Sequence, residues 1–164
     1  MAKERTIILK SYDNNRIALE HDDSTNDIVP GMAVVETSLR KCKRIQAKQS
    51  KLDNYVTTMI VTENNLAGLE ISGAYKEGYD IDVWLPGPGD IGLVKLDNAT
   101  KQSLSFGDAL SPTTNGGFRK AAGETKSTNI SAIGDRPVCR VLEAVADDGL
   151  GTKDADSWVK VRFL

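Results

Sequence analysis

A Pro-Gly corner between two short apolar segments constrains the fold of this chain more than any other feature. Apolar residues alternate with polar ones over residues 80–85, which is the period-two pattern of a half-buried strand. The sequence Pro-Gly-Pro-Gly over 86–89 excludes regular structure, because proline lacks an amide donor and glycine permits sharp corners. A second strand is therefore expected to begin at Ile91.

The rest of the chain repeats this unit of strand, corner and strand. We find no helical period that persists beyond two turns, whereas β-forming runs recur about every ten residues. This predicts an all-β fold, a small β-barrel or barrel-like sandwich with an extended N-terminal arm. We expect residues 1–20 to form the N-terminal arm or an edge hairpin, and residues 21–164 to form a single β-barrel domain. The expected strands fall near 6–9, 16–19, 28–35, 55–61, 80–85, 91–96, 118–121, 138–144 and 158–164.

Two turns share a Gly-Asp pair that precedes an apolar strand. They read Pro88-Gly89-Asp90-Ile91 and Phe106-Gly107-Asp108-Ala109-Leu110. In each turn we expect the glycine to adopt a conformation that other residues avoid, and the aspartate to accept backbone N–H bonds.

The C-terminal run is the clearest amphipathic strand of the sequence. Val159, Val161 and Phe163 fall on one face of this run, and Lys160 and Arg162 fall on the other. We expect it to pair with the strand around Val141.

Composition limits the class of protein. The net charge of −2 argues against a dedicated nucleic-acid binder, and no apolar run is long enough to span a membrane. No signal peptide is visible, so synthesis in the cytoplasm is expected. Cys42 and Cys139 lie in strand-like runs and are expected to be buried free thiols.

The sequence offers no catalytic constellation. It contains no phosphate-binding loop, no nucleophile elbow and no zinc-ligand spacing, so we predict no enzyme activity, no cofactor and no metal site. The single histidine, His21, stands at the start of a polar loop and is expected to be solvent-exposed. The acidic pairs Asp80/Asp82 and Asp147/Asp148 are interpreted as solvated carboxylates.

One run is strongly basic and permits three interpretations. It can be a solvated strand and turn, where lysines also discourage edge pairing. It can be a docking patch for an acidic protein surface, or a phosphate contact. The cations are Arg40, Lys41, Lys43, Arg44, Lys48 and Lys51.

The motifs of residues 55–164 resemble the head-decoration (cement) proteins of tailed bacteriophages. The resemblance is carried by the two Gly-Asp turns, by Val-Cys-Arg-Val-Leu-Glu-Ala at 138–144, and by Val-Lys-Val-Arg-Phe at 159–163. It implies a small β-barrel on the outer surface of the capsid, bound to the major capsid protein and to itself, with a homotrimer favoured over a homodimer. This chain departs from the pattern in its longer, more charged N-terminal third.

Contacts to the capsid or to sister subunits are expected from the N-terminal segment, the basic run and an exposed corner at Trp84. Packing of Trp84 in the core is the alternative. Deleting residues 1–12 is expected to leave the barrel folded. Other roles consistent with the sequence are a head-completion or tail ring subunit and a carbohydrate-binding β-module of a fibre. The candidate contact residues are Lys3, Arg5, Ile7, Leu9, Arg40, Lys41, Lys43, Arg44 and Trp84.

Overall fold

The structure is a computed structural model, and it describes residues 6–13, 15–22, 27–44, 58–63, 73–97, 103–113, 115–121, 137–143 and 158–164. Every named element in these ranges is a β-strand, which confirms the all-β prediction. The strands are β1 (Ile8–Lys10), β2 (Arg16–His21), β3 (Ala33–Ser38), β4 (Lys41–Arg44), β5 (Met59–Val61), β6 (Asp80–Trp84), β7 (Ile91–Lys95), β8 (Ala109–Pro112), β9 (Phe118–Lys120), β10 (Cys139–Val141) and β11 (Trp158–Phe163).

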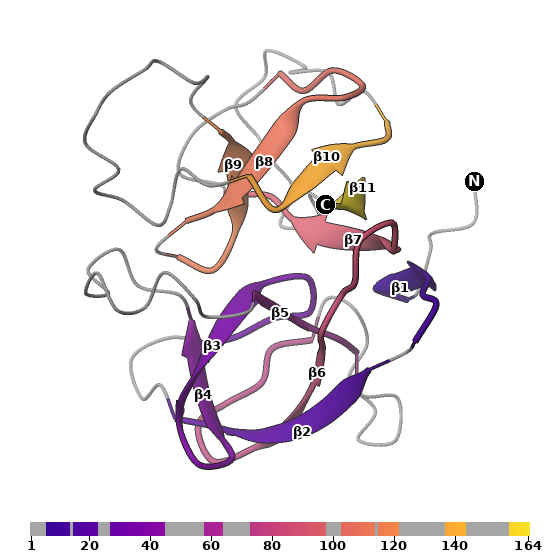
Figure 1. Cartoon of the computed structure of the whole chain (residues 1–164). Coiled ribbons are helices and arrows are strands. Elements are labelled where there is room, and N and C mark those ends of the chain that lie inside the picture. Colours follow the sequence, from indigo (N-terminus) through magenta and orange to yellow (C-terminus); the bar gives the residue numbers. More distant parts are fainter. Residues whose placement is uncertain are drawn as a thin grey trace, which may run out of the picture.

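Five strands close into the expected barrel, which forms the lower half of Figure 1. Their order is β2-β4-β3-β5-β6, and β6 pairs with β2 to complete the ring. The β2–β4 pair is parallel, and the other pairs are antiparallel. Closure removes free strand edges from this part of the molecule. The interior is filled by Leu19, Ile28, Val34, Cys42, Met59, Val61, Tyr75, Ile81 and Val83.

A second sheet, which the sequence did not predict, lies beside the barrel in the upper half of Figure 1. Its order is β1-β7-β11-β10-β8-β9, and all of its pairs are antiparallel. The predicted pairing of the C-terminal strand is confirmed, because Val141 stands opposite Val161. Residues 21–164 are thus divided between a barrel and a sheet, where we expected one barrel.

The N-terminal segment is part of both sheets, as far as the structure describes it. Strand β1 is an edge strand against β7, whereas β2 lies within the barrel, so the two strands do not form the expected hairpin. The carboxylate of Glu63 accepts a hydrogen bond from the Thr6 hydroxyl (2.6 Å) and another from the Ile7 amide (2.9 Å). The prediction of an extended arm is therefore wrong for residues 6–20. Residues 1–5 lie outside the described part.

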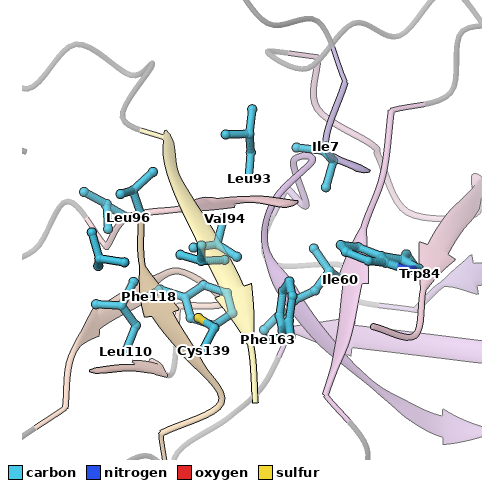
Figure 2. Close-up of a cluster of buried hydrophobic side chains, with 14 of the residues drawn as sticks. Ile7, Ile60, Trp84, Leu93, Val94, Leu96, Leu110, Phe118, Cys139 and Phe163 are labelled. Atoms are coloured by element: carbon cyan, nitrogen blue, oxygen red, sulfur yellow. The ribbon is translucent and has the colours of Figure 1, made fainter. Parts of the chain in front are cut away.

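Barrel and sheet share one apolar core. Ile60 and Trp84 enter it from the barrel, and Val94, Val161 and Phe163 enter it from the sheet. The rings of Trp84 and Phe163 meet edge to face, with centroids 5.3 Å apart and an interplanar angle of 81°. Figure 2 shows these two rings and Ile60 meeting between the two sheets. The C-terminal end of β6, at Val83 and Trp84, is consequently buried on both faces.

The two Gly-Asp turns have the predicted geometry. Gly89 and Gly107 have φ angles of 90° and 87°, in the region that favours glycine. The Asp90 carboxylate accepts from the Gly87 amide (3.0 Å), and the Asp108 carboxylate accepts from the Ser105 amide (2.9 Å).

Each turn also binds the strand beside it in the same way. The amide of Gly89 donates to the Phe163 carbonyl, and the amide of Phe163 donates back to the Asp90 carbonyl. The corresponding bonds run from Gly107 to Val141 and from Val141 to Asp108. The β7–β11 and β8–β10 pairs are therefore joined at their turns by the same pattern of backbone hydrogen bonds.

Candidate interaction surface

The cysteines and paired carboxylates considered in the sequence analysis do not gather into one site within the described residues. Cys42 and Cys139 are free and buried, as predicted, and burial raises the pKa of the Cys42 thiol to about 12. Burial also raises the pKa of the Cys139 thiol far above its usual value. Asp80 is exposed and Asp82 is half-buried. Residues 147 and 148 are outside the described part of the chain.

The prediction that His21 is exposed is wrong. It ends β2, where it is 1% exposed and stands opposite Cys42 in the parallel β2–β4 pair. Its amide donates to the Tyr79 carbonyl (2.9 Å), and its carbonyl accepts from the Gly78 amide (2.9 Å). Strand β2 therefore extends through His21, where the sequence suggested that a polar loop had already begun.

The described residues contain neither a clustered set of metal ligands nor a long apolar helix. Within these ranges, no group of three or more His, Cys, Asp or Glu side chains is placed to hold a metal ion. The same residues contain no helix with the length and apolar character needed to cross a bilayer.

The prediction of an exposed corner at Trp84 is also wrong, because this side chain is fully buried. Ile7 is equally buried, so its side chain is not available to a partner. Leu9 is partly buried and packs against the shared core. Lys3 and Arg5 lie outside the described residues. Of the N-terminal candidates in the described part, none presents a fully exposed side chain.

The basic run falls on the β3–β4 hairpin and divides into paired and outward-facing charges. Lys41 lies 3.5 Å from both Asp22 and Glu20, and these carboxylates raise the pKa of its ammonium group, Asp22 more than Glu20. Arg44 donates to the Asn115 carbonyl at 3.3 Å. Lys48 and Lys51 lie outside the described ranges.

Arg44 also lines a shallow cleft of about 220 Å³ at the junction of the barrel and the sheet. Lys95 and Asp97 stand in the same cleft, so its charges are mixed. The outward-facing charges of the run are therefore those of Arg40, which is exposed, and Lys43, which is half-buried.

The hairpin tip, which we define as residues 36–40, is the most exposed continuous segment among these candidates. All five of its residues are exposed, and Leu39 reaches 88%. Arg40 adopts a positive φ of 62°, which ends the turn before β4. Leu39 was not among the predicted contact residues, although its place between the turn-forming Ser38 and a basic run was the available signal.

The fold defines an all-β protein in which a closed barrel and an open sheet share a core, with an apolar side chain displayed at a hairpin tip. In comparisons with known proteins, no family model matches this chain, and no curated protein matches it.

Proposed function

We propose that this chain is a structural virion protein, a capsid decoration (cement) protein that binds the outer surface of a tailed-phage head. It links neighbouring copies of the major capsid protein and associates with itself, as a homotrimer in preference to a homodimer. The observation that carries this proposal is the hairpin tip, where Leu39 is 88% exposed beside the cationic Arg40.

Rigidity supports this role. The hairpin tip belongs to two strands of the closed barrel, and β3 is hydrogen-bonded on both sides, to β4 and to β5. The barrel in turn shares a core with the second sheet. A contact presented by such a body loses little conformational entropy on binding, so more of the contact energy appears as affinity.

Lattice binding also fits a small contact. An apolar side chain such as Leu39 can fill a shallow pocket of a partner, while the surrounding polar residues exclude water. An oligomer that engages several identical subunits adds such contacts at high effective concentration, so each contact can be weak. A repeating capsid surface offers that arrangement.

The test is co-sedimentation with expanded heads assembled from the partner that the proposal requires, a major capsid protein of the same genome. We expect the wild type to pellet with heads, and Leu39→Asp to lose at least about tenfold in affinity because it places a charge in an apolar contact. The matched control is Phe106→Asp, since Phe106 is 74% exposed on the second sheet and not at the hairpin tip.

Two results would contradict the proposal in different ways. A wild-type protein that does not pellet with heads would overturn the decoration role. Equal binding by wild type and Leu39→Asp would keep that role and remove the hairpin tip from the contact. Deletion of residues 1–12 is not a useful variant, because it removes Ile7 from the core and β1 from the sheet.

Native mass measurement tests the oligomer. A trimer is expected, and a dimer would still be compatible with decoration. A hexamer or larger ring would favour the head-completion or tail role, and specific glycan binding would favour the fibre module.

A further inference from the structure

The outer face of the second sheet carries a line of cross-strand neighbours that the fold does not explain. Strand register places Lys10 opposite Ile91, Ile91 opposite Arg162, Arg162 opposite Arg140, and Arg140 opposite Ala109. Directly paired residues in a sheet project from the same face. We call these five residues the arginine row. Their neighbours along the strands, Gly92, Val161 and Cys139, face the barrel or the shared core instead.

The three cations of the row, Lys10, Arg140 and Arg162, are all exposed. Arg140 and Arg162 stand directly opposite each other on adjacent strands, whose backbones are about 5 Å apart. Like charges in this position destabilise a sheet. Arg140 donates to the Gly107 carbonyl (3.0 Å), and Lys10 lies over the Tyr12 ring (5.2 Å). Within the described part of the chain, no carboxylate pairs with Arg162.

The next residue of β11 on this face is Lys160, whose charge is already paired. Lys160 lies 3.4 Å from Glu143, whose side chain is 61% exposed. An exposed pair of this kind contributes little to stability and exchanges easily with another partner. A chain with a net charge of −2 therefore gathers cations on one face of one sheet.

We propose that the arginine row is the docking surface for an acidic segment of another protein. Each guanidinium group can hold one carboxylate through two parallel hydrogen bonds, and their spacing admits two carboxylates side by side. A bound acidic segment also neutralises the repulsion between Arg140 and Arg162. This surface is separate from the hairpin tip and does not depend on the proposed capsid role.

Two other occupants fit less well. A second copy of the chain docked through the same face would place arginine against arginine, which is repulsive. Single-stranded nucleic acid is bound by aromatic rings interleaved with cations. The exposed Tyr12 ring lies at the Lys10 end of the row, but the residues between the cations are Ile91 and Ala109. Aliphatic side chains suit the backbone and side chains of a peptide.

The experiment measures binding of a fluorescein-labelled peptide of five Glu-Ser repeats by fluorescence anisotropy at low salt. An oligonucleotide of ten thymidines is the comparison probe. The row variant is Arg140→Gln with Arg162→Gln. The matched control is Arg16→Gln with Lys76→Gln, which removes the same charge from exposed positions outside the row and the hairpin tip. We expect the wild type and the control to bind the peptide alike, and the row variant to bind about tenfold more weakly.

The proposal is overturned if the wild type does not bind the peptide, or if both double variants weaken binding equally, since net charge alone would then explain it. It is also overturned if the control loses more affinity than the row variant. Tighter binding of the oligonucleotide, with the same dependence on the row, would assign the surface to nucleic acid.

A charge-conserving variant protects the experiment against misfolding. Arg140→Lys with Arg162→Lys keeps both charges and removes the bidentate geometry, so we expect an intermediate affinity. Wild-type affinity in this variant would overturn the bidentate contact. Because neither probe contains a capsid protein, this experiment and the head-binding assay fail independently.

Discussion

Trp84 and Gly92 lie so close that a Cβ atom on Gly92 would stand 2.6 Å from the indole Cζ3 atom. The same Cβ would lie 2.9 Å from the Ile7 carbonyl oxygen, which is backbone and cannot swing away. Gly92 belongs to the second sheet, Trp84 belongs to the barrel, and Ile7 leads into β1. The absence of one side chain therefore lets three parts of the fold meet.

Gly92→Ala is expected to destabilise the protein by about 2–3 kcal/mol, since overpacking a filled core forces shifts of backbone and side chains. Gly87→Ala is the control, because its Cβ would meet only a carboxylate oxygen at 3.8 Å. We expect that control to stay within about 0.5 kcal/mol of wild type in urea unfolding. Equal stability of the two variants would contradict this account of the interface.

Adding Trp84→Phe should relieve part of the Gly92→Ala cost. The smaller ring makes room for the methyl group, and the Trp84 Nε1 atom finds no hydrogen-bond acceptor among the described residues, so no bond is lost. A double-mutant cycle in urea should give a favourable coupling of about 0.5 kcal/mol or more. If the two changes in unfolding free energy simply add, the strain caused by Gly92→Ala does not come from its contact with Trp84.

The features that the sequence predicted correctly are local. The alternation over 158–163 identified β11 and its buried face, and the Gly-Asp pairs identified two turns with positive glycine φ angles. Both signals depend on neighbouring residues of the chain, so no knowledge of distant contacts was needed. The buried state of Cys42 and Cys139 followed from the strand-like runs around them.

The features that it did not predict depend on what covers each face. Alternation places Trp84 on the face of β6 opposite Ile81, but it does not say that a second sheet covers that face. The burial of Ile7 was missed for the same reason, because β1 was expected to stand apart from the rest of the protein. His21 is buried because a parallel β2–β4 contact closes the barrel there, and such a contact leaves no local pattern.

A pH dependence follows from Asp108. A hydrogen bond from Lys120 (2.7 Å) and one from the Ser105 amide lower the pKa of its carboxyl group below the usual 3.8. A group with a lowered native pKa stabilises the fold above its unfolded pKa, and that contribution is lost as the pH falls through the native value.

Asp108→Asn should therefore be less stable than wild type at pH 7, and the difference should shrink as the pH falls below about 4. Urea unfolding at pH 7, 5 and 3 measures it. Lys120→Met should show the same trend, because it removes the largest cause of the shift. A difference that is constant across this pH range would refute the linkage.

The two thiols are expected to be inert in the native state. Both are fully buried, and thiolate is the reactive form, so a raised pKa suppresses reaction further. Titration with an aromatic disulfide reagent should give no reaction of Cys42 or Cys139 in buffer and complete reaction of both in denaturant. Rapid labelling of either thiol without denaturant would show that its part of the core opens.

Arg40→Gly is expected to stabilise the hairpin. Arg40 has a φ of 62°, a conformation that costs a residue with a side chain about 1 kcal/mol and costs glycine nothing. Thermal unfolding should show a gain of about 0.5–1 kcal/mol, and Arg40→Ala, which keeps a Cβ atom, is the matched control. No difference between these variants would mean that the turn carries no strain.

Arg162→Gln should also be more stable than wild type, although it removes a charge from the surface. Arg162 faces Arg140 across the β10–β11 pair, and relieving a like-charge pair in a sheet gains about 0.2–1 kcal/mol. Arg16→Gln is the control, because Arg16 is exposed and stands opposite Trp84, not opposite a cation. Thermal unfolding at low salt should show the gain for Arg162→Gln alone, and added salt should reduce it through screening. A loss of stability would mean that Arg162 holds the sheet together, and the arginine row would then need no acidic partner to explain it.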